Sequence, residues 1–379
     1  MTGSLQIKSE KYYIVINTTE NGKRKQKWIT TGLPVKGNKR KAEQMLRDKL
    51  HEYELVPKVA EKDILFADYI RFWLEAAKRR VDVVTYQGYE LMANEQVIPY
   101  FDKVMLKKVT HEMLQAFFDE KKMSGRKDGK GGLSASSLRQ YKNILNQTLT
   151  LAVKSGLIPS NPCQFVELPR KDHYETHYYS AEQLKTLFDS IKDDPLYPLI
   201  RITALYGLRR SEVLGLKWDS IDFDAKRLTI KHTVSKVTKT IEKDKTKNSS
   251  SHRSFPLTPD AEEIFRIAKD SEADNRRLFG KDYQGNNYVF KWPNGVPFSP
   301  DYVSAHFSLL LKRNDLPHIR FHELRHSCAS LLLNSGFTLK DVQEWMGHAD
   351  IQMTANIYGH LDTARKQTLA DTLSGSLFG

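Results

Sequence analysis

Four clusters of side chains in the second half of the chain have the types and spacing needed to act on a phosphate group. They are Arg209 with Glu212, the basic stretch 243–253 (KDKTKNSSSHR), His322 with Arg325, and Gly347-His348 with Tyr358 ten residues later. Arginine offers a planar fork that matches phosphate oxygens, histidine can move a proton, and tyrosine can attack as a nucleophile. Each cluster alone also has an ordinary interpretation, as a surface ion pair, a solvated turn, or a histidine or tyrosine with a structural role.

Arg209 is the most informative of these residues by itself. It lies within a strongly apolar stretch, 198–218, that the pattern predicts to be helical, and Glu212 shares its face of that helix. An arginine inside a buried helix needs an anionic partner or ligand, because burial of an unpaired charge is costly. The sequence therefore predicts an anion-binding site at this point.

The segment from His322 to His326 (HELRH) also matches the short zinc motif H-E-x-x-H, with Glu344 as a distant third ligand. A zinc metalloprotease is therefore one alternative function. It leaves the Arg209 cluster and the spacing from His348 to Tyr358 unexplained. Stoichiometric zinc bound through the two histidines of the purified protein would favour it.

Taken in order, the four clusters resemble the signature of the tyrosine recombinase family, also called the phage integrase family. That signature has an arginine after a Gly-Leu turn, a lysine in a hairpin, a His-x-x-Arg box, a Gly-His pair, and a tyrosine nine or ten residues beyond. The resemblance implies a site-specific DNA recombinase that integrates and excises a mobile element, either a prophage or a conjugative transposon. A non-catalytic DNA-binding protein on the same scaffold and a type IB topoisomerase-like enzyme are further alternatives.

The resemblance assigns strand cleavage to three residues. Tyr358 attacks the scissile phosphate and forms a 3′-phosphotyrosyl bond, while Arg209 and Arg325 clamp the non-bridging oxygens. Two fixed cations stabilise the negative charge that grows in the transition state. The new bond conserves the energy of the broken phosphodiester, so a free 5′ hydroxyl can attack it without ATP.

The same resemblance gives supporting roles to other residues. Lys245 protonates the departing 5′ oxygen. The hairpin loop is longer than is usual in the family, so Lys247 is the alternative, and Lys245 is favoured because it begins the Lys-Thr pair. His322 assists acid–base steps, His348 hydrogen-bonds the phosphate or orients the tyrosine, and Glu212 supports the framework.

The elements that position these residues are predicted to form a mainly helical unit, 175–379, with a small antiparallel sheet. Ser180 opens a helix through a capping box, and Thr258-Pro259 and Ser299-Pro300 open two more. Strands are predicted at 228–234, 238–241 and 254–257, and the region after 322 is predicted to be mostly helical.

Two further units precede this one. Helical spacing at 66–74, 109–121 and 134–154 predicts an all-helical unit over 64–170. The first 60 residues read as a small β-rich unit, with strands at 5–8, 11–17 and 25–30 and a helix at 41–55. The fold class is therefore multidomain α+β. By resemblance, the units are an arm-type DNA-binding domain (1–60), a core-site DNA-binding domain (64–170) and a catalytic domain (175–379).

Composition agrees with a polyanionic partner. The chain has 59 Lys and Arg against 46 Asp and Glu, a formal net charge of +13, which favours nucleic acid. Cys163 and Cys328 predict neither a disulfide framework nor a thiolate metal site, which suits a reducing cytoplasm. The sequence has no apolar run long enough to predict a membrane span and no N-terminal pattern typical of a secretory signal. We expect no cofactor, because no phosphate-binding loop or acidic metal cluster is present.

The resemblance also implies partners. They are double-stranded DNA attachment sites with core and arm sequences, a homotetramer on DNA, an excisionase-type directionality factor and a host DNA-bending protein, at the nucleoid of the bacterial cytoplasm. Candidate phosphate contacts are Lys23, Arg24, Lys25 and Lys27 in the first unit and Arg139 and Lys142 in the second. Such contacts make affinity fall with salt.

Overall fold

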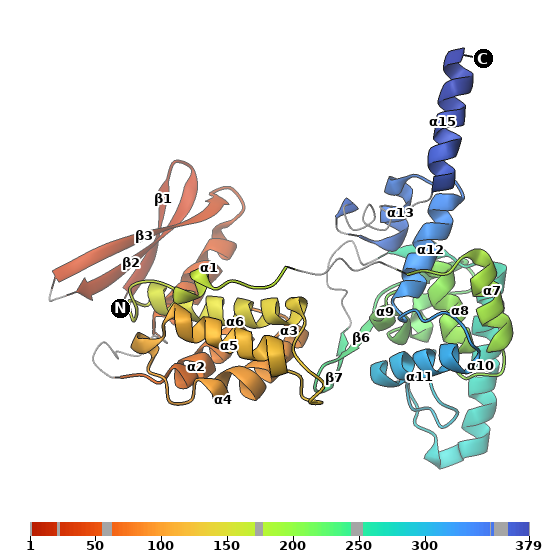
Figure 1. The fold of residues 1–379 in the computed structure, drawn as a ribbon, viewed down its shortest axis with the longest axis horizontal. Helices are drawn as coiled ribbons and strands as arrows, with labels where there is room; N and C mark the ends of the chain where they lie inside the picture. Colours follow the sequence, from red (N-terminus) through yellow and green to blue (C-terminus); the bar gives the residue numbers. More distant parts are fainter. Residues whose placement is uncertain are drawn as a thin grey trace. The chain divides into compact units, whose positions relative to one another are not determined.

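The computed structural model describes residues 2–20, 23–54, 63–170, 177–243, 253–348, 350–351 and 363–378. The chain divides into two compact units, Met1–Asp172 and His173–Gly379, and each is described by itself (Figure 1). The fold class is multidomain α+β, as predicted: a three-stranded sheet, an all-helical region, and a mainly helical region with small antiparallel sheets.

The N-terminal sheet has the order β1-β2-β3 and is antiparallel throughout, with α1 packed on one face (Figure 1). The elements are β1 (Thr2–Lys8), β2 (Lys11–Glu20), β3 (Lys23–Pro34) and α1 (Lys39–Glu54). Ser9 and Glu10 both have positive φ, 49° and 58°, which suits the tight turn of a twisted hairpin. Ile16 is fully buried, and its partner Gly3 lies directly against Leu46 and Leu50 of α1. The predicted strands and helix are confirmed, and the strands extend beyond the predicted ranges.

The helical region packs around a core of aromatic and aliphatic side chains, among them Trp73, Phe101, Phe117 and Leu145. Its helices are α2 (Phe66–Lys78), α3 (Val83–Met92), a π-helical turn (Ala93–Val97), α4 (Ile98–Tyr100), α5 (His111–Ser124) and α6 (Ala135–Lys154), with short 3-10 turns at Leu106–Lys108 and Pro162–Phe165. The three predicted helices are confirmed, whereas the sequence pattern did not indicate α3.

The second unit surrounds a separate core with helices and two small sheets. Its helices are α7 (Ala181–Ser190), α8 (Tyr197–Tyr206), α9 (Arg210–Leu214), α10 (Pro259–Phe279), α11 (Pro300–Arg313), α12 (Glu323–Asn334), α13 (Leu339–Met346) and α15 (Thr363–Phe378), with 3-10 turns at Trp218–Ser220 and Gly280–Asp282. One sheet has the order β4 (Ile221–Asp222), β5 (Arg227–Thr229), β8 (Ser254–Pro256), and the other pairs β6 (Thr233–Lys236) with β7 (Thr240–Lys243).

Local capping chemistry predicted three helix starts correctly. Ser180 and Gln183 form the reciprocal capping box at α7, with N-to-side-chain distances of 2.9 and 3.2 Å. Thr258 accepts from the backbone of Ala261 at α10, and Ser299 caps α11 in the same way. These contacts need only neighbouring residues, so the sequence alone can predict them.

Two predicted elements are interrupted. The helix expected over 198–218 is wrong beyond Tyr206, because Gly207 takes the left-handed conformation (φ 61°) and ends α8 before the short α9 begins. The strand expected over 228–234 is also wrong in its middle. There the backbone at His232 and Thr233 passes so close to Gly215 that an added Cβ would lie 2.4 Å from the His232 oxygen. The chain consequently leaves one sheet after β5 and enters the other at β6.

No helix in the part of the chain that the structure describes is long and apolar enough to cross a lipid bilayer.

Candidate active site

Arg209 is positioned by the break between α8 and α9. Its backbone is extended (φ −70°, ψ 151°) at the N-cap of α9. The prediction that Arg209 lies inside a helix is therefore wrong. Its Nη1 donates to Oε1 of Glu212 (2.6 Å), and its Nη2 donates to the backbone oxygen of Gly347 (3.0 Å). The side chain keeps 29% of its surface exposed, so a ligand can reach a guanidinium that is already held in place.

Glu212 is the carboxylate around which this site is built. It is only 1% exposed, and both its oxygens accept from Arg209 and from Arg253. Burial raises the pKa of Glu212, but the charges and hydrogen bonds of Arg253, with the charges of Arg209 and Arg325, outweigh burial and lower the pKa to about 2. Glu212 is therefore ionised across the physiological range.

Arg325 is the most deeply buried cation of the site, with 1% of its surface exposed on α12. Its Nη1 donates to the backbone oxygen of Gly207 (2.6 Å) and its Nη2 to that of Met346 (2.5 Å). Burial, followed by the nearby charge of Arg209, lowers the pKa of Arg325, and a guanidinium still remains charged at neutral pH. A charge held in this way favours the approach of an anion.

Three consecutive backbone oxygens at the C-terminal end of α13 accept hydrogen bonds from three different arginines. Trp345 accepts from Arg253 (3.1 Å), Met346 from Arg325, and Gly347 from Arg209. The last carbonyls of a helix have no partner within the helix and carry the negative end of its dipole. The end of α13 therefore draws together cations supplied by α12, by the start of α9 and by the residue before β8.

Two predicted histidines lie beside these arginines. His348 is 6% exposed, and burial, with the charges of Arg325 and Arg209, lowers its pKa to about 3. His322 stands at the N-cap of α12 and keeps an exposed surface. Partial removal of the His322 ring from water, followed by the charges of His326 and Arg325, lowers the pKa of His322 as well. Both rings are therefore neutral at pH 7 in the free protein.

These lowered pKa values predict a loss of stability in mild acid. Below about pH 6.5, the ordinary pKa of histidine, the unfolded chain binds protons that the folded site refuses. The free energy of unfolding therefore decreases as the pH is lowered, by up to about 1.4 kcal/mol per pH unit for the buried His348. The exposed His322 contributes less, because solvent screens it. Thermal unfolding of the full chain between pH 7.5 and pH 5 measures this slope. His348→Gln should flatten it and His318→Gln, on an exposed loop, should not; equal slopes in all three proteins would contradict the prediction.

The HELRH segment does not form a metal centre in the structure. The carboxylate of Glu323 accepts from the backbone N of Arg320 (2.5 Å) and from its guanidinium (3.1 Å), so it is not free to act as a base. The rings of His322 and His326 lie 5.3 Å apart and nearly perpendicular. Within the described residues, no group of three or more His, Cys, Asp or Glu could hold a metal ion.

Several predicted residues are not placed by the structure. Lys245 and Lys247 lie in the stretch 244–252, and Tyr358 lies in the stretch 352–362. Both stretches are outside the described residues. The side chains of Lys23, Arg24 and Lys25 are likewise not described, although their backbone belongs to β3. These assignments stay predictions.

The other basic candidates have local surroundings. Lys27 is exposed on β3. Arg139 on α6 donates to the backbone oxygens of Ala135 (3.0 Å) and Pro169 (2.9 Å), and Lys142 donates to that of Val166 (2.6 Å). In the free chain, both α6 side chains therefore hold the segment that follows this helix.

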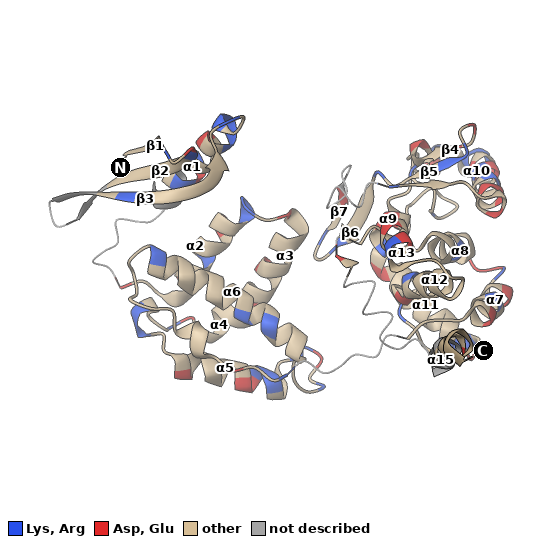
Figure 2. Cartoon of the chain, turned by 90° about the horizontal axis from the view of Figure 1, so that it is seen from above, with Lys and Arg blue, Asp and Glu red and all other residues tan. Residues whose placement is uncertain are grey.

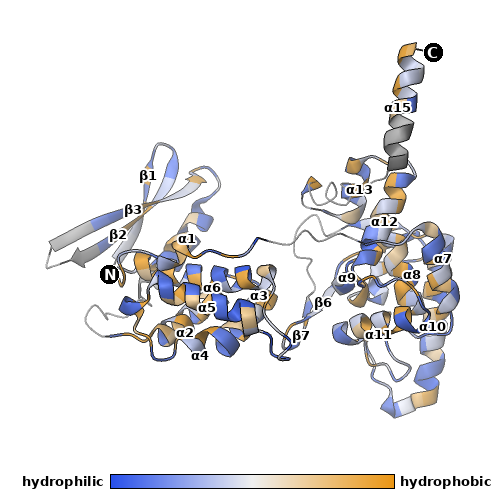
Figure 3. Cartoon of the chain, viewed as in Figure 1, coloured by the Kyte–Doolittle hydropathy of each residue, from blue (hydrophilic) through white to orange (hydrophobic). Residues whose placement is uncertain are grey.

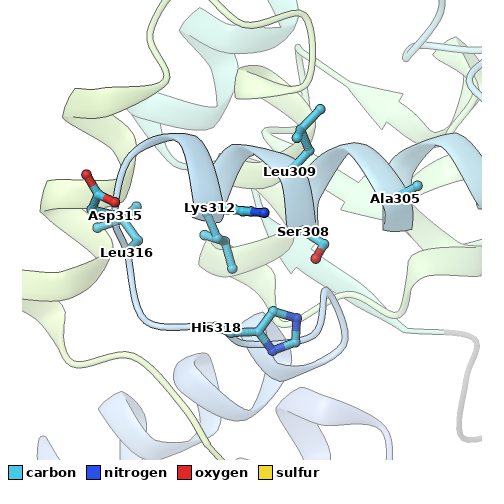
Figure 4. Close-up of a pocket in the computed structure, with 8 residues that line it drawn as sticks. Ala305, Ser308, Leu309, Lys312, Asp315, Leu316 and His318 are labelled. Carbon is cyan, nitrogen blue, oxygen red and sulfur yellow. The ribbon is translucent and has the colours of Figure 1, made fainter.

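Two surface grooves of the second unit lie away from the arginines. One follows α11 and the loop after it, where Leu309, Leu316 and Lys312 line it (Figure 4). The other runs along α10 to the hairpin around Trp292. Neither includes Arg209, Arg325 or the two site histidines, so the anion-binding geometry is not part of these grooves.

Comparison with known proteins agrees with this geometry. The model of the phage integrase family matches residues 178–365, and the model of the phage integrase N-terminal SAM-like domain matches residues 65–122. A "tyrosine recombinase XerC" of Xylella fastidiosa is 30% identical over 61% of this chain and 72% of its own length. The chain belongs to the phage integrase family. A "tyrosine recombinase XerC-like" protein of Caldanaerobacter subterraneus subsp. tengcongensis is 26% identical over 96% of both chains.

The solved structure of the Tn1549 transposon integrase (residues 82–397) in complex with transposon right end DNA has the same fold as this integrase. It matches with a TM-score of 0.65 at 22% identity, over 82% of this chain and all of the other. As a member of the family, this integrase is a site-specific recombinase, an enzyme that breaks and rejoins DNA and integrates a mobile element. The metalloprotease and the non-catalytic alternatives have no support.

One residue of the integrase site was not singled out from the sequence. Arg253 ends the basic stretch 243–253, and the pattern gave it no role. Its partners, Glu212 and Trp345, are 41 and 92 residues away in the chain, so no local pattern could reveal the contact.

Proposed function

We propose that this integrase cleaves a DNA strand with Tyr358 while Arg209 and Arg325 hold the scissile phosphate. The observation that carries the proposal is the convergence of the two guanidiniums on adjacent carbonyls, those of Gly347 and Met346, next to His348. Arg209 and Arg253 hydrogen-bond the carboxylate of Glu212, and the charge of Arg325 also acts on it, so the local charge of the four side chains is +2. Within this cluster Arg209 and Arg325 are held in place to bind a phosphodiester before the reaction, so their charge need not reorganise during the reaction.

The proposed steps balance without a cofactor. The Tyr358 oxygen attacks phosphorus, its proton passes to the neutral ring of His322, and the bond from phosphorus to the 5′ oxygen breaks. Lys245, or Lys247 in the alternative, protonates that oxygen. The reverse steps, with the 5′ hydroxyl of another strand as nucleophile, release the tyrosine and join the exchanged strands. The lowered pKa of His322 keeps its ring neutral at pH 7, so the ring has a nitrogen lone pair available for a proton.

Recombination of the protein's own DNA ends tests this function. The substrate is a pair of plasmids that contain the joined ends of the mobile element encoding the chain and the empty target. We expect recombinant plasmids in the presence of EDTA and without ATP. A requirement for a divalent metal or a nucleotide, or cleavage without rejoining, would contradict the mechanism.

We further propose that residues 1–60 bind arm sites and that residues 64–170 and 175–379 bind the core site. On the face of the N-terminal sheet away from α1, Tyr13 and Trp28 lie near Asn17 and Gln26, which are hydrogen-bonded to each other. A sheet face with amide and aromatic groups suits the edges of bases in a major groove. Lys27 is exposed on the edge strand β3, where it suits a phosphate. Figure 2 shows further basic residues on α5 and α6.

A tetramer on DNA is part of the proposal, because recombination joins two duplexes and each needs cleavage on both strands. An excisionase and a host DNA-bending protein would set direction and DNA shape in the bacterial cytoplasm. Leu373, Leu377 and Phe378 at the end of α15 are 60%, 70% and 86% exposed. Figure 3 shows apolar colouring at this end of the helix. Such a helix end is suited to pack on a neighbouring protomer.

Deleting the residues after Ala370 is therefore expected to uncouple strand exchange from DNA binding. The truncated chain should bind a single core site with unchanged affinity, because every arginine and histidine side chain of the site described above remains. It should lose synapsis or the ordered exchange of strands, as measured by junction and recombinant products on native gels. Unchanged recombination by the truncated chain would count against a role for this tail between protomers.

A further inference from the structure

Arg253 is a buried cation that the proposed mechanism does not use. It directly precedes β8 and follows the segment that contains both candidate lysines. Only 9% of its side-chain surface is exposed. All three nitrogens of its guanidinium donate to acceptors within the protein, whereas Arg325 uses only two of its nitrogens in this way. Burying an arginine is costly unless hydrogen bonds and an opposite charge compensate it.

The guanidinium of Arg253 is fixed by three hydrogen bonds in one plane. Nη1 and Nη2 donate to the two oxygens of Glu212 (3.1 and 3.0 Å), and Nε donates to the backbone oxygen of Trp345 (3.1 Å). The guanidinium also stacks over the ring of Phe255, which itself packs edge-on against Trp345. Arg253 thus ties the Glu212 carboxylate to the end of α13.

Both partners of Arg253 also hold the proposed phosphate-binding arginines. Each oxygen of Glu212 accepts a second bond from Arg209, one from its backbone N and one from its Nη1. The two residues that follow Trp345 accept from Arg325 and Arg209. A shift of the Glu212 carboxylate or of the end of α13 would therefore move both guanidiniums.

We propose that Arg253 is a positioning residue of the recombination reaction, which acts through Glu212 and α13 to hold Arg209 and Arg325 on one phosphate. This inference rests on the proposed function. It assigns Arg253 no contact with DNA, so its loss should slow cleavage and leave DNA affinity unchanged.

The test uses single-turnover cleavage of a nicked attachment-site DNA at saturating protein. Arg253→Gln should lower the rate of covalent adduct formation by about 100-fold, the usual cost of small misplacement at a reacting centre. Arg253→Lys keeps the buried charge but cannot form the planar fork, so it should give an intermediate loss. Arg266→Gln, which removes an exposed fork to Glu262, is the matched control and should cleave normally.

A pH profile separates positioning from general damage to the fold. Glu212 faces Arg209, Arg253 and Arg325, and Arg253 contributes most to keeping it ionised. Without Arg253, the carboxylate should take up a proton at higher pH, so the cleavage rate of Arg253→Gln should begin to fall at a higher pH than that of the unsubstituted protein. In a Glu212→Gln background, Arg253→Gln should neither shift this pH dependence nor slow cleavage much further.

The outcomes are distinct. No adduct from the unsubstituted protein would overturn the proposed function itself. Normal cleavage and an unchanged pH profile in Arg253→Gln and Arg253→Lys would overturn the inference alone. A loss of DNA affinity in step with the loss of cleavage, or additive effects of the Arg253 and Glu212 substitutions, would also overturn it. Thermal unfolding of each variant shows whether a loss of cleavage comes from a chain that no longer folds. If Arg253→Gln does not fold, the cleavage rate and pH profile of Arg253→Lys test the inference.

Discussion

Replacing Arg325 by lysine is expected to slow DNA cleavage by about 1,000-fold, the loss typical for one preorganised donor to transition-state charge. Arg325 uses one Nη for the Gly207 oxygen and the other for the Met346 oxygen. Its other N–H groups have no hydrogen-bond partner among the described residues, and we expect them to donate to the phosphate. A lysine has one nitrogen and cannot hold two carbonyls and a phosphate in these directions. Adduct formation with time at saturating DNA measures the rate.

The matched control for this substitution is Arg313→Lys, at the exposed end of α11. It should cleave at the rate of the unsubstituted protein. DNA binding by Arg325→Lys should persist, since most of the affinity for DNA comes from distributed phosphate contacts. Cleavage by Arg325→Lys within a few-fold of the unsubstituted rate would remove Arg325 from the phosphate clamp.

The largest effect on stability is expected from Glu212→Gln. The substitution leaves Arg209 and Arg253 without the carboxylate that they share and Arg325 without a nearby opposite charge, and breaking a buried pair by removing one partner costs about 3–5 kcal/mol. The lowered pKa of Glu212 gives a similar figure, since a fall from 4.5 to about 2 corresponds to about 3 kcal/mol. The midpoint of thermal unfolding should fall by about 10 °C.

The contribution of Glu212 also has a defined pH range. Its folded-state pKa lies below the ordinary value, so the stabilisation is complete above about pH 4.5 and is lost as the pH falls toward 2. The difference between the unsubstituted protein and Glu212→Gln should shrink over this interval. Glu344→Gln, which removes an exposed partner of Lys340, is the control and should unfold close to the unsubstituted protein. Equal midpoints for both variants would show that the buried carboxylate does not stabilise the arginines.

The sequence indicates the contact of Arg209 with Glu212 but not the backbone conformation that positions them. The pattern predicts both residues inside one helix, whereas the structure has a break at Gly207. The break at Gly207 depends on contacts from distant residues: a Cβ there would lie 2.6 Å from Met346, and its oxygen accepts from Arg325. The local sequence pattern cannot reveal either contact, because the apolar run Ile202–Leu208 is typical of a continuous helix.

Long-range pairing explains the other limits of prediction. The caps at Ser180 and Ser299 depend on residues three positions away and were predicted correctly. The exchange between two sheets after β5 depends on Gly215, and the role of Arg253 depends on the end of α13. These features arise only when the core brings distant segments together.

The most direct test of the account is to identify the residue that becomes attached to DNA. The full chain is incubated with a nicked attachment-site DNA, the adduct is digested with protease and nuclease, and the modified peptide is sequenced by mass spectrometry. We predict a nucleotide linked through its 3′ phosphate to Tyr358, and no adduct from Tyr358→Phe. A linkage to another residue, a linkage through a 5′ phosphate, or an adduct that persists in Tyr358→Phe would contradict the central claim.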